Sequence, residues 1–303
     1  MRMLKPISIS GAVLAAVLLL AAAAAEAQMR QASAEVVRAT GRVEALRTGQ
    51  TQWVAAAPGT RLVDGDHIRA MAGASADLSL PDGSTILVAE NTRFVVTRLQ
   101  YDAQTRERNA AFHLVAGKVR AQVTRAAVQL VRARESNFTI STPVGVAAVR
   151  GTIPVVFYNP ATQQAIVFSL PSPGEDPASA RVTFFNFATG VMTTFTGNSF
   201  VTIAGNQPTS APTPVSSLSP AAQAQIQTAV NQATAGSGQL TAPTVFIVSD
   251  AQIQSILQQI TGVPGVTAGA PSPIFTPAST GSLGQDVQNA PPAPPSCASP
   301  PCP

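Results

Sequence analysis

Cysteine is nearly absent from this chain of 303 residues, and both cysteines lie at its C-terminal end. Cys297 and Cys302 flank a Pro-rich stretch, SCASPPCP, and can close a small disulfide ring there. Such a ring closes a tail and does not hold a core together. The pair is a poor zinc site because two thiolates leave the tetrahedral shell incomplete and no histidine is near.

Histidine is almost as scarce, since His67 and His113 are the only two. No nucleophile-elbow, zinc-protease, Walker or dinucleotide-binding motif occurs in the sequence. Four aspartates could supply paired carboxylates, but they fall at turns or on strand faces: Asp64, Asp66, Asp77 and Asp82. The segment from Asp64 to His67 matches no metal-ligand spacing, and turn residues around a glycine explain it better. We therefore predict no enzyme activity, no metal and no cofactor.

Charge is missing from the last third of the chain. After Asn206 only Asp250 and Asp286 are charged, whereas residues 28–206 carry 17 Lys+Arg and 12 Asp+Glu, a balance of 17 − 12 = +5. Ordinary solvated arginines on strand faces explain this excess. Alternatively, it serves an anionic partner such as lipopolysaccharide, a glycan or an acidic protein surface. Nucleic acid is disfavoured because aromatic residues do not interleave with the arginines and the chain carries an export signal.

That export signal occupies residues 1–27. Arg2 and Lys5 precede an apolar run from Ile7 to Ala25, and Ala25-Glu26-Ala27 offers small residues around a cut before Gln28. This layout is typical of a cleaved secretory signal peptide. The alternative is an uncleaved membrane anchor, which would be the chain's only contact with a membrane. We expect a periplasmic or secreted protein.

Residues 34–206 show the alternation of apolar and polar side chains that is typical of strands. Turn signals separate the segments: Pro81-Asp82-Gly83 combines a preset φ, an Asx turn and a positive φ. Gly117 separates two further alternating segments, Ala111–Val115 and Lys118–Thr124. The pattern predicts an all-β domain, built as a sandwich, a barrel or a short solenoid.

Residues 207–303 form a tail rich in Pro, Ala, Ser and Thr, a composition that favours disorder. Short helices are expected near residues 219–234, where Ser219-Pro220 suits a helix start, and near residues 250–261. In the second helix, Ile256 and Leu257 belong to an apolar repeat at helical spacing. That helix packs on the β domain, docks on a partner or forms only transiently.

A set of short motifs along residues 34–206 resembles the FecR-like family of periplasmic β domains. The motifs are Gly41-x-Val43, Trp53, Gly65-Asp66-x-Ile68-Arg69, Asp82-Gly83-Ser84, Leu114-x-x-Gly117-x-Val119, Thr142-Pro143 and Val149-Arg150-Gly151-Thr152. The resemblance implies a short solenoid-like or rolled antiparallel sheet. Pro154 departs from the family pattern, so we expect its strand to lie at an edge or to begin after it.

The resemblance also implies an exported module that binds another component of the cell envelope. The best-known members of the family place an intracellular anti-sigma segment and a membrane helix before the β domain. Here only six residues precede the apolar run, so we expect no direct contact with a sigma factor.

Two function classes follow. The first is a regulatory module that contacts an envelope protein, with Arg150, Gly151 and Thr152 as a partner-facing turn and Ile256 and Leu257 as a docking segment. The second is a structural or surface protein that binds glycan or lipopolysaccharide through its arginines. The same turn has a structural interpretation, in which Gly151 supplies a backbone conformation and Arg150 pairs with a carboxylate.

Overall fold

The computed structural model describes residues 29–124, 137–150, 152–172, 176–221, 223–224 and 226. Strands dominate this part, as the alternation predicts, and the all-β fold is confirmed. The helical elements are two 3-10 turns, η1 (Pro177–Ser179) and η2 (Val215–Ser217), and helical residues that begin at Pro220. None of the described helices is long and apolar enough to cross a membrane. The expected signal peptide and the helix at 250–261 lie outside the described residues.

The strands pair into two sheets that share one long strand. The first, sheet A, has the order β4 (Val54–Ala55), β3 (Val43–Leu46), β6 (His67–Ala70), β9 (Thr92–Tyr101), β10 (Arg108–Gln122), β11 (Asn137–Thr142), β12 (Gly145–Arg150), β15 (Arg181–Asn186), β16 (Met192–Thr196), with β1 (Arg30–Gln31) beside the end of β9. The second, sheet B, has the order β5 (Arg61–Leu62), β2 (Ala34–Thr40), β7 (Ser75–Ser79), β8 (Thr85–Val88), β10, β13 (Ile153–Asn159), β14 (Gln164–Leu170), β17 (Ser199–Ala204), β18 (Thr213–Pro214).

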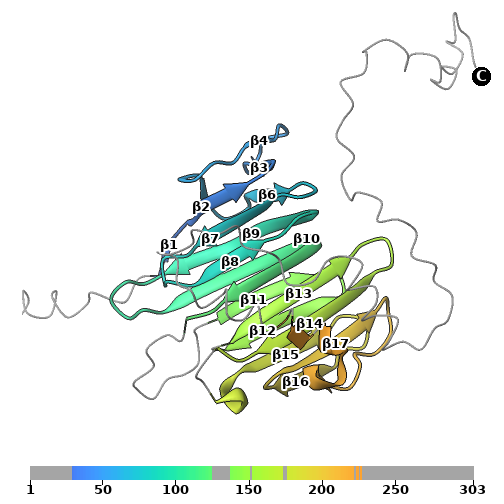
Figure 1. The fold of residues 1–303 in the computed structure, drawn as a ribbon. Helices are drawn as coiled ribbons and strands as arrows, with labels where there is room; N and C mark the ends of the chain where they lie inside the picture. Colours follow the sequence, from blue (N-terminus) through green and yellow to red (C-terminus); the bar gives the residue numbers. More distant parts are fainter. Residues whose placement is uncertain are drawn as a thin grey trace, which may run out of the picture.

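All these pairs are antiparallel except β10 with β11. After β10 the chain makes hairpins that alternate between the sheets: β11–β12 in sheet A, β13–β14 in sheet B, β15–β16 in sheet A and β17–β18 in sheet B. Figure 1 shows the resulting stack of strands, coloured from blue to orange along the chain. The rolled sheet expected from the sequence is thereby confirmed.

Strand β10 passes from one sheet to the other at Gly117. On one side of it Leu114 pairs with Phe94 in sheet A, and on the other Val119 pairs with Val88 in sheet B. Gly117 has φ +95°, and a Cβ there would lie 2.4 Å from the hydroxyl oxygen of Thr92. Only glycine combines this backbone with this close approach. The two segments expected around Gly117 are therefore one bent strand.

One apolar core lies between the sheets. Sheet A contributes a row of phenylalanines, with ring centroids of Phe94 and Phe112 5.3 Å apart and those of Phe112 and Phe138 5.4 Å apart. Sheet B contributes aliphatic side chains such as Val36 and Ile86 to the same buried cluster. Burying one such side chain stabilises the fold by about 1.5–3 kcal/mol. Because the cluster draws on both sheets, they pack face to face.

The outer faces of the two sheets differ. In β13 and β14 of sheet B almost every residue is buried, so neighbours such as Val155 and Val156, which point to opposite faces, are both covered. In β12 of sheet A buried and accessible residues alternate, as expected for a strand with one solvated face. Around these strands, sheet A therefore presents the accessible face.

Two boundaries differ from the sequence expectations. Pro154 lies inside β13, which runs between β10 and β14, so the prediction of an edge strand or a later start was wrong. The ladder with β10 begins at Val155, and Pro154 lies beyond its end. The missing N–H therefore costs no bond to β10. Regular pairing also continues past Asn206, because β18 pairs with β17.

Candidate binding surface

The Gly65-Asp66-x-Ile68-Arg69 motif has a structural role. The carboxylate of Asp66 is buried, accepts the backbone N–H groups of Thr48 (2.9 Å) and Val63 (3.1 Å), and pairs with Arg47 (2.7 Å). Although burial alone would raise the pKa of Asp66, these hydrogen bonds and the guanidinium lower it. Ile68 is fully buried in the core. The motif thus fixes a turn and a strand, and leaves Arg69 on the outer face.

Arg69 belongs to a group around the single tryptophan. Its guanidinium lies 4.1 Å from the ring centroid of Trp53, and that of Arg93 lies 5.7 Å away. Glu44 pairs with Arg69 at 2.6 Å. Burial alone would raise the pKa of the Glu44 carboxyl, but hydrogen bonds from Arg42 and Arg69 lower it. The cations of this group already have partners, so it is a weak candidate for binding a further anion.

The two histidines lie in one row across sheet A. His67 on β6 and His113 on β10 both pair in register with Val95 of the strand between them. Burial lowers the pKa of both imidazoles, and the Arg93 guanidinium lowers that of His67 further. Both rings are therefore neutral at pH 7.

His113 also lies 2.9 Å from the hydroxyl oxygen of Ser141, which supplies two members of a Ser-His-Asp arrangement. In the described ranges no ion pair or hydrogen bond joins a carboxylate to His113. Asp64, three residues before the other histidine, accepts the N–H of Leu99 at 2.7 Å. Within the same ranges no group of three potential ligands is placed to hold a metal ion.

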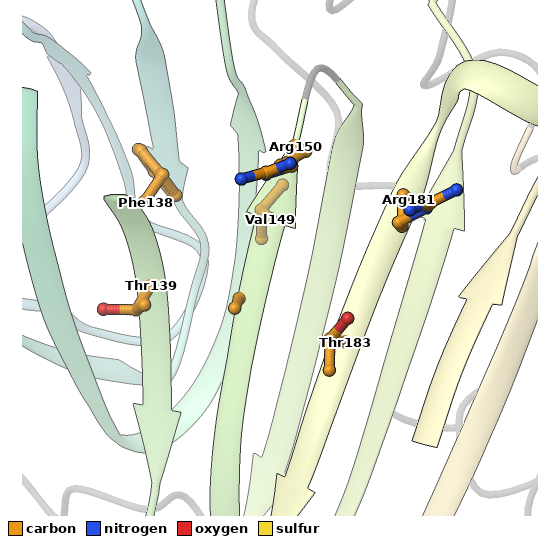
Figure 2. A pocket seen from close by; sticks show the side chains of 7 residues that line it. Phe138, Thr139, Val149, Arg150, Arg181 and Thr183 are labelled. Carbon is orange, nitrogen blue, oxygen red and sulfur yellow. The ribbon is translucent and has the colours of Figure 1, made fainter. Parts of the chain in front are cut away.

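The accessible face has a hollow of about 280 Å³ over strands β11, β12 and β15. The hollow forms because the outward residue of β12 is the small Ala148, which lies between Thr139 and Thr183 on the flanking strands. Arg150 and Arg181 stand at one end, as Figure 2 shows. The two arginines are partners in the ladder, and both are exposed. Two guanidinium groups and two hydroxyls are suited to hold a carboxylate or another oxyanion.

An exposed apolar group, here called the apolar end, lies where β15 turns into β16. Phe187, Val191 and Met192 are 52%, 57% and 69% exposed. Phe185 extends the group, its ring centroid 5.9 Å from that of Phe187. Exposed apolar groups of this kind are typical of sites that contact a partner.

The predicted partner-facing turn is only partly on this surface. Arg150 is exposed at the end of β12. Thr152 is fully buried and its hydroxyl donates to the carbonyl of Leu170 at 2.6 Å, so it holds the crossing from sheet A to sheet B. Gly151, Ile256, Leu257, Cys297 and Cys302 lie outside the described residues. Arg181 and the apolar end were not singled out from the sequence, because neither belongs to a motif.

Comparison with known proteins agrees with the sequence motifs. Residues 66–169 match the family model described as FecR protein. Two crystal structures of a candidate anti-sigma factor from Parabacteroides distasonis ATCC 8503, at 2.50 Å and 1.65 Å resolution, are similar at 13% identity and a TM-score of 0.37. The alignments cover 65% of this chain and 91% and 92% of those chains. No curated protein matches the sequence.

The family match covers the middle of the described β domain. The matched segment runs from Asp66 to Ser169 and includes the bend at Gly117, the hairpin at Thr142-Pro143 and the crossing at Thr152. The resemblance drawn from the motifs is confirmed over residues 66–169, where this chain matches the FecR family model.

Proposed function

We propose that this chain is an exported, non-catalytic binding module of the cell envelope that contacts a protein partner in signalling or regulation. The observation that carries the proposal is a contrast between the outer faces: strands β13 and β14 of sheet B are covered on both faces, whereas the outer face of sheet A presents the apolar end and an arginine pair. A partner that binds a rigid sheet needs an exposed face of this composition.

The apolar end and the hollow make different contributions. Burial of Phe187 and Met192 supplies affinity, because both side chains expose more than half of their surface in the isolated chain. Arg150 and Arg181 supply orientation, because a planar guanidinium pairs with a carboxylate in a fixed geometry. The partner is therefore a protein with an apolar contact beside an acidic group.

The remaining parts of the chain serve this role as follows. Residues 1–27 direct export, residues 34–206 together with β18 form the binding domain, and the residues after β18 act as a tether. Ile256 and Leu257 form a second docking segment, and a disulfide between Cys297 and Cys302 closes the end of the tail. The support for these roles is the composition of the sequence.

The test is crosslinking and capture from intact envelopes with a tagged full chain. Phe187→Ser with Met192→Ser is compared with Val54→Ser, which changes a valine that is 49% exposed on β4 at the opposite end of sheet A. We expect one discrete protein that the double variant loses and the Val54 variant keeps. Recovery of bulk glycan or outer-membrane material, with no discrete protein, would overturn the proposal in favour of a structural envelope protein.

A further inference from the structure

Strand β16 is an edge strand without the usual protection. In the described part of the chain it pairs only with β15. The other sheet ends are closed by two-residue strands, β4, β5 and β18, and β18 contains Pro214. By contrast β16 has five residues, Met-Thr-Thr-Phe-Thr, with no charge and no proline. Natural sheets shorten, charge or cover such edges, because a free edge recruits other strands.

The free edge has identifiable hydrogen-bonding groups. Asn186 N–H donates to Val191 O at 3.0 Å, and Gly197 N–H donates to Ala180 O at 3.1 Å. Groups of an antiparallel strand alternate between its two sides. The N–H and C=O of Met192 and Thr194 and the N–H of Thr196 therefore point away from β15. The carbonyl of Thr196 already accepts the hydroxyl of Ser199 at 2.8 Å.

The side chains beside this edge differ from end to end. Met192 and Thr196 both lie on the outer face of sheet A and are exposed. Met192 belongs to the apolar end, whereas Thr196 pairs in register with Arg181, which itself pairs with Arg150. A strand added to β16 would continue these rows. It would place one outward residue beside Met192 and another, four positions away, beside Thr196 and in the same row as Arg181.

We propose that an extended segment of a protein partner adds to the edge of β16 as a further antiparallel strand of sheet A. This inference rests on the proposed function and specifies how the partner is held. The segment carries Asp or Glu opposite Thr196 and, four residues later, an aliphatic side chain opposite Met192. Main-chain hydrogen bonds give the affinity of such a complex, and the alternate side chains give its specificity.

A second copy of this chain fits the edge less well. Two β16 strands paired along their full length about Thr194 would place Met192 of one copy opposite Thr196 of the other. The apolar end of each copy would then meet the polar end of the other and stay unburied. An aliphatic residue on a foreign strand covers the apolar end, and an acidic residue opposite Thr196 attracts the Arg181 guanidinium on the same face.

The test uses the full chain and a fluorescent, capped peptide with the core Glu-Val-Thr-Val-Leu, whose glutamate is placed opposite Thr196. Thr194→Pro removes a free N–H without removing a bond to β15, and Thr194→Ala keeps that N–H as its control. We expect the proline variant to weaken peptide binding by about tenfold or more, and the alanine variant to leave it near wild type. A peptide N-methylated at its edge-facing amides should also fail, which tests the edge without altering the protein.

Charge reversal tests the register. Arg181→Glu should lower affinity for the glutamate peptide and raise affinity for the same peptide with lysine at that position. Equal binding of both peptides by this variant would contradict the register.

Two results would overturn strand addition. In the first, Thr194→Pro captures the same partner from envelopes as wild type does, although Phe187→Ser with Met192→Ser loses it. The proposed function would then hold without strand addition. The second is a dimer in light scattering that Thr194→Pro abolishes, since β16 would then pair with a second copy. If no version captures a protein, the proposed function itself fails.

Discussion

Arg150 and Arg181 lie directly opposite each other in the β12–β15 ladder, both exposed and both beside the hollow over Ala148. Like charges in this position destabilise a sheet by roughly 0.2–1 kcal/mol. The pair therefore concentrates positive charge on the accessible face of sheet A.

Replacing one of these arginines should separate stability from binding. We expect Arg181→Gln to leave the free energy of unfolding unchanged or to raise it by up to about 1 kcal/mol, because repulsion is removed. The variant should nevertheless bind an acidic partner peptide more weakly. Chemical denaturation and peptide titration measure the two effects. Arg98→Gln is the control, since Arg98 is exposed on β9 with the neutral Ala111 opposite; an equal loss of binding there would refute a specific role for Arg181.

The bend at Gly117 should be intolerant of any side chain. Gly117→Ala forces a Cβ to within 2.4–2.5 Å of Thr92 and Asn91 in addition to imposing a positive φ on alanine. Gly190→Ala imposes a similar φ of +68° where no atom lies within 4 Å. Strained backbone alone costs about 1–3 kcal/mol. We expect thermal unfolding to show a clearly larger loss for Gly117→Ala, and similar losses would mean that the close approach contributes nothing.

Asp66 should contribute acid-sensitive stability. Because the pKa of Asp66 in the folded chain is below its unfolded value of about 3.9, its carboxylate stabilises the fold above that pH. This contribution is lost as pH falls through the folded pKa. Asp66→Asn should therefore be less stable than wild type at pH 7, and the difference should shrink below about pH 4. Denaturation curves from pH 7 to pH 2 measure it, and a constant difference would contradict the assignment.

A buried polar network joins the Asp82 turn to β10. Asp82 pairs with Arg108, and the side chains of both are almost fully buried. Thr124 donates its hydroxyl to Asp82 O at 2.9 Å, and Arg108 donates to Thr124 O at 2.9 Å. Removing one partner of a buried pair typically costs about 3–5 kcal/mol.

We therefore expect Asp82→Ala to destabilise the domain by about that amount, because it leaves the Arg108 charge buried and unpaired. The double variant Asp82→Ala with Arg108→Met should recover much of the loss. A double-mutant cycle by urea denaturation measures the coupling. Additive effects of the two single changes would show that the pair is not coupled.

The sequence allowed the all-β fold and the faces of many strands to be predicted, because alternation reports which side of a strand is buried. Asp66 and Gly117 belong to motifs, which marked both as turn or bend positions. The pairing of Arg150 with Arg181 in the β12–β15 ladder could not be predicted, because the intervening hairpin belongs to the other sheet. The prediction for Pro154 was wrong because a proline is excluded only where the ladder needs a backbone N–H. The end of the β10–β13 ladder depends on pairing between distant parts of the chain, which the local sequence does not show.

The most direct measurement is hydrogen exchange of the full chain with and without its captured partner, read in peptides that span β16 and β13. We expect slowed exchange at Met192 and Thr194, whose amides point away from β15, and no change in β13, which is covered on both faces. Protection confined to β13 or to its neighbours in sheet B, with β16 unchanged, would contradict the claim that the partner binds sheet A.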